Sequence, residues 1–109
     1  MIKDHLVFLR HIVDFCADIE FYIVKHSREK FISRKMLQDA VIRKIEIIGE
    51  AVKNLPKEFK EEHPEIPWKD IASMRDKVIH GYFGVDLDLV FDIAQRDIPE
   101  LRRKIEKFL

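Results

Sequence analysis

Residues 33–54 have the sequence SRKMLQDAVIRKIEIIGEAVKN, and this stretch decides the fold that the chain is expected to adopt. Its apolar side chains recur at steps of three and four residues, the spacing of one face of an α-helix. They are Leu37, Val41, Ile45, Ile48 and Val52, and Leu55 continues the series directly after the stretch. Ser33 is a suitable N-cap, and Pro56 follows the expected end at Asn54. The stretch therefore predicts a long amphipathic helix.

The same helix carries a second apolar row beside the first. This row consists of Met36, Ala40, Ile47 and Ala51. An apolar face of this width exceeds what one neighbouring helix covers, so the helix is either central in its fold or shared with another subunit. Gly49 lies in the helix interior, where glycine costs roughly 1 kcal/mol relative to alanine. A close packing contact is therefore expected at Gly49.

Other parts of the chain show the same helical spacing. They are residues 3–25, residues 67–81 with Pro67 in the first turn, a segment capped by Asp86, and a short segment that Asp97 caps ahead of Pro99. Residues 26–31 and 55–67 are polar or rich in proline, which predicts connections, the second an irregular link with one short turn. The sequence therefore predicts an all-α fold, an antiparallel bundle of four main helices and a short fifth.

Length and composition agree with one small helical domain. The 109 residues suffice for a single core, so residues 1–109 are expected to form one domain. Lys plus Arg and Asp plus Glu each number 20, whereas a general nucleic-acid coat protein would carry a basic excess. Residues 25–44 have a local basic surplus, which is interpreted as a solvated helix face in preference to a polyanion site.

The sequence also bears on the compartment. Cys16 is the single cysteine and cannot form an internal disulfide, and its apolar neighbours predict a buried, inert thiol. No apolar run reaches the length of a membrane span, and the first residues lack the layout of a signal peptide. The expected location is cytoplasmic, with no membrane association.

Metal and cofactor motifs are absent from the sequence. It contains no paired Glu-x-x-His, no Cys-x-x-Cys, no glycine-rich phosphate loop and no His-Glu-x-x-His. No metal site and no cofactor are therefore expected. Four histidines are interpreted as ordinary surface residues: His5, His11, His26 and His63.

The candidate site is the run from Arg75 to Tyr82, RDKVIHGY, in which His80 follows Arg75 by five residues. Five residues turn a helix by about 500°, which leaves the two side chains about 140° apart around its axis. Either the helix ends between them, or a second copy of the chain completes the site. The structural alternatives are an ion pair between Arg75 and a bundle carboxylate, and a Tyr82 ring that packs beside Phe83.

The pattern Arg-Asp-x-x-x-His-x-Tyr resembles the Arg-polar-x-x-x-His signature of the HEPN superfamily, and the trailing tyrosine makes it similar to the HepT-like branch. Asp76 stands where many relatives have asparagine, which is also small and polar. Residues 47–51 (IIGEA), 63–68 (HPEIPW) and 82–86 (YFGVD) resemble segments of the same branch. The resemblance covers nearly the whole chain in order.

This resemblance implies a homodimeric HEPN-type bundle in which both motifs face a shared cleft. It further implies a metal-independent endoribonuclease, the toxin of a type VII toxin–antitoxin pair. RNA would be the substrate, Arg75 and His80 the catalytic residues, and Asp76 their polar support. An MntA-like minimal nucleotidyltransferase would be the antitoxin and would attach AMP to Tyr82.

Two other functions stay open from the sequence. One is a catalytically inactive HEPN adaptor that binds nucleotide or a nucleotidyltransferase partner. The other is a structural module whose apolar helix faces only mediate dimerisation. An intact Arg75 and His80 favour the enzyme over the inactive adaptor, whereas an inactive dimer with His80 buried and no basic cleft would favour the structural module.

Overall fold

A computed structural model of the chain describes residues 5–79 and 84–109. Its helical elements are α1 (His5–Ile23), α2 (Arg28–Ser33), α3 (Lys35–Lys53), α4 (Lys57–Glu62), α5 (Trp68–Ala72), α6 (Met74–Val78), α7 (Leu87–Asp92), the π-helix η2 (Ile93–Asp97) and α8 (Ile98–Glu106). None of the helices in the described part of the chain is both long and apolar enough to cross a membrane.

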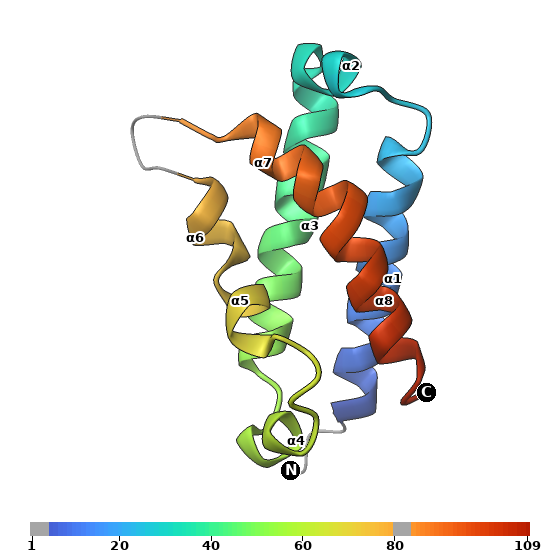
Figure 1. Ribbon diagram of the computed structural model, residues 1–109, viewed down its shortest axis with the longest axis vertical. Coiled ribbons are helices and arrows are strands. Elements are labelled where there is room, and N and C mark those ends of the chain that lie inside the picture. The colour runs from blue at the N-terminus through green and yellow to red at the C-terminus, as the bar shows by residue number, and fades with distance from the viewer. Residues whose placement is uncertain (1–4, 80–83) are drawn as a thin grey trace.

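The helices form an antiparallel bundle around α3 (Figure 1). α3 packs against α1 on one side and against α5 and α6 on the other. α7, η2 and α8 follow one another without a break as one rod, of which η2 and α8 pack on α1 and α7 contacts α2, α3 and α6. Along the chain, α1, α3, the α5–α6 pair and the rod from α7 to α8 run in alternating directions (Figure 1). The predicted all-α bundle is confirmed.

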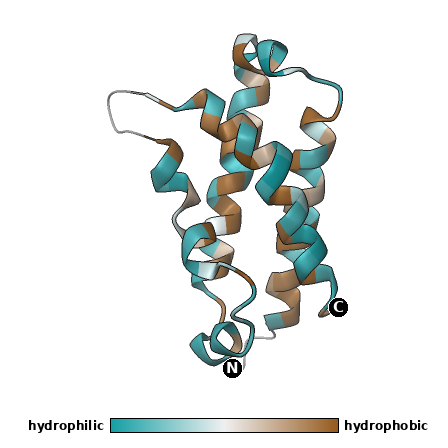
Figure 2. Cartoon of the chain, in the orientation of Figure 1, coloured by the Kyte–Doolittle hydropathy of each residue, from teal (hydrophilic) through white to brown (hydrophobic). Residues whose placement is uncertain are grey.

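The core is built from the apolar stripes that the sequence predicts. In α3, Val41, Ile45, Ile48 and Val52 are fully buried. They belong to one hydrophobic cluster with the buried residues of α1 and α8, among them Leu9, Ile12, Ile98 and Ile105. Figure 2 shows the apolar residues as brown bands that recur along α1 and α3. The three-and-four spacing therefore identified the buried face of the longest helices correctly.

The close packing contact that the sequence predicts at Gly49 is present. A Cβ atom built on it would lie 3.2 Å from the backbone oxygen of Ala72 and 3.5 Å from that of Ile71. Any larger residue would push α5 away from α3, since the obstructing atoms belong to the backbone and cannot rotate aside. Gly49 thus sets the close approach of α5 to α3, and α6 follows α5 directly.

The expected connection at residues 26–31 is wrong, because α2 occupies most of it. Ser27 is the N-cap of α2, and its hydroxyl accepts a hydrogen bond from the backbone N–H of Lys30 at 3.2 Å. Phe31 anchors the short helix in the core, where its side chain is fully buried. One buried aromatic residue gives no periodicity, so the pattern did not reveal this helix.

Ser33 is not the N-cap of α3, as the sequence had suggested. It is the last residue of α2, and its hydroxyl donates to the backbone oxygen of Lys30 at 2.9 Å. Gln38 joins the two helices, because its amide nitrogen donates to the backbone oxygens of Phe31 at 2.9 Å and Ile32 at 2.8 Å. These bonds satisfy carbonyl groups that the end of a helix leaves free.

The helix expected over residues 67–81 is divided into α5 and α6 at Ser73. The hydroxyl of Ser73 donates to the backbone oxygens of Lys69 at 3.0 Å and Asp70 at 3.2 Å. Such side-chain bonds compete with the regular backbone ladder and favour a break. α6 then ends at Val78, earlier than the expected end near Gly81.

Asp86 caps α7 as predicted, since its carboxylate accepts from the backbone N–H of Leu89 at 3.1 Å. The predicted cap at Asp97 is wrong, because Asp97 has helical backbone angles and makes no capping hydrogen bond. The rod continues through the π-helix η2 into α8, with Pro99 in its first turn. Pro99 has no N–H to donate and its ring crowds the preceding turn, which accounts for the widened helix before it.

Cys16 is fully buried, which confirms the predicted burial of its thiol. Burial, with a smaller contribution from Glu20, raises the pKa of the Cys16 thiol to about 12. Because only the thiolate is reactive, we expect the folded protein at pH 8 to react with a thiol reagent far more slowly than the unfolded protein. Labelling with and without denaturant tests this, and equal rates in both would contradict it.

Candidate functional site

Arg75 is the catalytic candidate that the structure describes, and it lies on the outer side of α6. Met74 and Val78 on either side of it in the sequence are buried and fix α6 against the core. The Arg75 side chain is 49% exposed. The helix therefore presents the guanidinium group at the surface, where a large charged ligand can reach it.

A groove of about 260 Å³ opens beside Arg75, between α3 and the α5–α6 pair. It is lined by Arg43, Glu46, Ile47, Gly49, Glu50, Lys53, Ala72, Arg75 and Asp76. Its three cationic side chains are matched by three carboxylates, so the groove of one chain has no excess of positive charge.

Arg75 is flanked by two of these carboxylates. Its Nε lies 3.8 Å from Oε2 of Glu46, and its Nη1 donates to Oδ1 of Asp76 at 3.4 Å. The ion pair with a bundle carboxylate, which was the structural alternative for Arg75, is therefore present. All three side chains are at least one-third exposed, so these pairs orient the guanidinium group and add little stability.

His80 and Tyr82, the other two residues of the candidate site, lie outside the described residues. α6 nevertheless ends at Val78, between Arg75 and His80. This is the first of the two arrangements that the sequence left open. The separation of about 140° applies only to a continuous helix, so it no longer restricts how Arg75 and His80 face a ligand.

The described residues on either side of His80 and Tyr82 are paired with each other. Ile79 and Val85 form an isolated antiparallel β-bridge. The backbone N–H of Asp86 donates to the backbone oxygen of Val78 at 2.8 Å. Gly84 has a φ of 95°, in the left-handed region that favours glycine. The two ends of the segment that contains His80 and Tyr82 therefore lie next to each other on the bundle.

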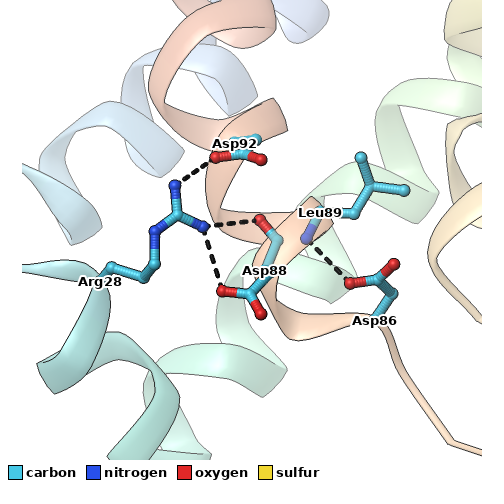
Figure 3. A network of polar contacts seen from close by, with 5 residues as sticks. All are labelled: Arg28, Asp86, Asp88, Leu89 and Asp92. Atoms are coloured by element: carbon cyan, nitrogen blue, oxygen red, sulfur yellow. Dashed lines mark hydrogen bonds and ion pairs between the residues drawn. The ribbon is translucent and has the colours of Figure 1, made fainter.

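Arg28 of α2 holds α7, the helix that follows this stretch (Figure 3). Its Nη1 donates to the backbone oxygen and to Oδ1 of Asp88, both at 3.2 Å, and its Nη2 lies 2.5 Å from Oδ1 of Asp92. The guanidinium carbon also lies 5.0 Å from the centre of the Phe91 ring. Hydrogen bonding to Arg28 lowers the pKa of Asp92 and raises that of Arg28. Sequence analysis missed this network, because Arg28 lies 60 residues from Asp88 and 64 residues from Asp92.

The interpretation of His63 as an ordinary surface residue is wrong. Its ring lies 4.6 Å from that of Phe59 and 4.2 Å from that of Phe108, and its backbone oxygen accepts a hydrogen bond from the Trp68 indole at 3.0 Å.

Within residues 5–79 and 84–109, no group of three or more histidine, cysteine or acidic side chains is arranged to hold a metal ion.

The sequence of the chain is similar to a known protein family and to several of its members. The model of a family described as "Ribonuclease HepT-like" matches residues 12–108. A protein of Thermococcus cleftensis, named a probable ribonuclease HepT, is 47% identical over 98% of this chain and 97% of its own length. One of Caldanaerobacter subterraneus, provisionally named an RNase, is 45% identical over 94% of this chain and 91% of its own length.

A third relative is longer than this chain. It comes from Methanocaldococcus jannaschii and is named a gamma-glutamylcyclotransferase and, provisionally, an RNase. The two are 50% identical over 100% of this chain, which spans 49% of the length of that relative. No solved structure matches the chain.

Proposed function

The chain belongs to the HepT-like ribonuclease family, and we propose that it is a metal-independent endoribonuclease, the toxin of a type VII toxin–antitoxin pair. One observation carries the proposal. Arg75 is exposed on the edge of a groove, and its helix ends at Val78, two residues before His80. The motif that resembles the HEPN signature therefore begins at an accessible surface.

RNA carries its own nucleophile, the 2′-hydroxyl group, so its cleavage requires proton transfer and charge stabilisation. In the proposed reaction the 2′-oxygen forms a bond to phosphorus while the bond from phosphorus to the 5′-oxygen breaks. One proton leaves the 2′-hydroxyl and one reaches the departing 5′-oxygen, and the products are a 2′,3′-cyclic phosphate and a 5′-hydroxyl end. His80 is suited to exchange these protons, because imidazole has an ordinary pKa of about 6.5.

Arg75 would stabilise the charge that develops on the phosphate oxygens. A guanidinium group presents two parallel N–H donors to an oxyanion, and this interaction strengthens as negative charge grows in the transition state. Asp76 lies within hydrogen-bonding distance of Arg75, with 3.4 Å between Oδ1 and Nη1. We assign Asp76 the supporting role of orienting the guanidinium group.

The proposed active form is a homodimer. The second apolar row of α3 supports it, because Met36 is 87% exposed and Ala40, Ile47 and Ala51 are only half-buried within one chain. Ile47 also lines the groove that contains Arg75. A second copy on this row would therefore meet the edge of the candidate site.

The proposed antitoxin is an MntA-like nucleotidyltransferase that attaches AMP to Tyr82. The phenolic oxygen would attack the α-phosphorus of ATP, with loss of a proton from the phenol and departure of pyrophosphate. Tyr82 is two residues from His80 in the sequence, so the added phosphate would place negative charge where RNA phosphates have to bind.

Chelation tests the proposed reaction directly. We expect the protein to cleave RNA at the same rate in the presence of EDTA, because no step uses a metal ion. The 5′ fragment should end in a 2′,3′-cyclic phosphate, which mass spectrometry of a short synthetic RNA identifies. Activity that EDTA abolishes and Mg²⁺ restores would contradict this mechanism. An RNA with a single 2′-deoxy sugar at the cut site is the matched control and should stay intact.

A further inference from the structure

The outer face of α3 carries a continuous seam of residues spaced alternately four and three apart. It consists of Met36, Ala40, Arg43, Ile47, Glu50 and Asn54. This spacing is typical of residues at a contact between two long helices. Arg43, Glu50 and Asn54 are exposed together with Met36, while the buried stripe of α3 points the opposite way into the core. α3 therefore buries one face in the core of its own bundle and leaves a second face open for contact.

The charges on this seam complement each other about Ile47. Arg43 lies four residues before Ile47 and Glu50 lies three residues after it. At a rise of about 1.5 Å per residue, they lie roughly 6 Å and 4.5 Å from it along the helix axis, on opposite sides. In an antiparallel pair of identical helices, Arg43 would face the partner's Glu50. Two-fold symmetry makes this contact twice.

We propose that a second copy of this chain packs on the α3 seam with the two-fold axis at Ile47, and that Arg43 pairs with the partner's Glu50. The inference deepens the homodimer of the proposed function by naming its surface and register. Shifting the register by about one turn would place Arg43 against the partner's Ile47 and Glu50 against the partner's Ala40. Both charges would then lose water without gaining a partner, which disfavours that register.

The side chains are available for this contact. Arg43 makes no ion pair with any other residue in the described part of the chain. Within the described residues Glu50 has one ion pair, at 3.4 Å with Lys53, and both side chains are more than half exposed. An exposed pair of this kind contributes little and can be exchanged for a better one.

The proposed contact also changes the candidate site. Glu50 lines the groove beside Arg75, where it is one of three carboxylates matched against three cations. The partner's Arg43 would neutralise Glu50, and the chain's own Arg43 would pair with the partner's Glu50, which leaves Lys53 and Arg75 against Glu46 and Asp76 in each groove. Each groove would thus be completed by a residue of the other chain, the partner's Arg43.

Charge reversal and charge exchange test the inference. We expect Arg43→Glu and Glu50→Arg each to raise the dimer dissociation constant by at least about ten-fold, because each variant places like charges together at both symmetric contacts. The double variant Arg43→Glu/Glu50→Arg recreates both pairs with the signs exchanged. Its dissociation constant should return to within a few-fold of the wild-type value. Sedimentation equilibrium over a concentration series measures all four proteins.

Arg103→Glu is the matched control, because Arg103 is equally an exposed arginine but lies on α8, which packs on α1 and η2. It should dimerise as the wild type does, and circular dichroism should give all variants the same helix content. If Arg43→Glu behaves like Arg103→Glu, or if the double variant is not restored, this surface and register are overturned although a homodimer can remain. A wild-type monomer at micromolar concentration would overturn the homodimer as well, while RNA cleavage in EDTA tests the reaction separately.

Discussion

Replacing His80 by alanine is expected to reduce the rate of RNA cleavage by about 100-fold or more, the usual contribution of a general acid–base group. Alanine has no group that exchanges protons at neutral pH, whereas the 2′-hydroxyl and the 5′-oxygen both need a proton transferred. The measurement is a single-turnover cleavage rate on a short RNA at saturating protein. In cells, expression of the variant should leave growth and total RNA unaffected, in contrast to expression of the wild-type chain.

His11→Ala is the control, since His11 is an exposed histidine on α1 that lies far from α6 in the sequence. Its cleavage rate should match that of the wild type. Arg75→Lys should also be impaired, because a single ammonium group cannot reproduce the two parallel donors of a guanidinium group. Cleavage at the wild-type rate by His80→Ala would remove the proposed catalytic role of His80 and favour a contaminating nuclease.

The second large effect concerns Tyr82. With an MntA-like nucleotidyltransferase and ATP, the wild-type chain should gain the mass of one or more AMP groups and lose its ribonuclease activity. Tyr82→Phe lacks the phenolic oxygen that would attack the α-phosphorus of ATP. It should therefore gain no mass, and its cleavage rate should be the same with and without the transferase and ATP.

Tyr22→Phe is the control for this experiment, because Tyr22 is the other of the two tyrosines in the chain and is half-buried on α1. It should be modified and inactivated as fully as the wild type. Peptide mass spectrometry then locates the adduct. AMP on a residue other than Tyr82, or equal modification of Tyr82→Phe and the wild type, would overturn the assignment even if the ribonuclease reaction is correct.

The elements that the sequence predicted well are those whose burial repeats along one helix. The α3 stripe from Val41 to Val52 is fully buried as expected, and Gly49 meets the backbone of α5. α2 was missed because it is short and has a single fully buried anchor, Phe31, and because the side chain that completes its end, Gln38, belongs to the next helix. The predicted cap at Asp97 was wrong because Asp97 lies inside a helical run that continues from η2 into α8, and Pro99, which suggested a helix start, occurs within that run.

The sequence predicted the part of the candidate site that depends on residues close together in the chain. The Arg-x-x-x-x-His-x-Tyr spacing singled out Arg75, and the structure describes Arg75 at an accessible groove. Its contact with Glu46 could not be assigned, because 29 positions separate the two residues and several bundle carboxylates were equally eligible. The contacts of Arg28 with Asp88 and Asp92 of α7 could not be predicted for the same reason. Such contacts depend on how rods pack, which periodicity within each rod does not determine.

The pairing of Ile79 with Val85 has a consequence for the entropy of substrate binding. Bringing the two ends of a chain segment together lowers its conformational entropy, and the cost of closure applies whenever that closure occurs. Here the ends of the segment that contains His80 and Tyr82 meet as part of the folded bundle, so this cost belongs to folding. In the proposed ribonuclease, a bound RNA would not have to supply it, and a larger share of its contact energy would remain as affinity.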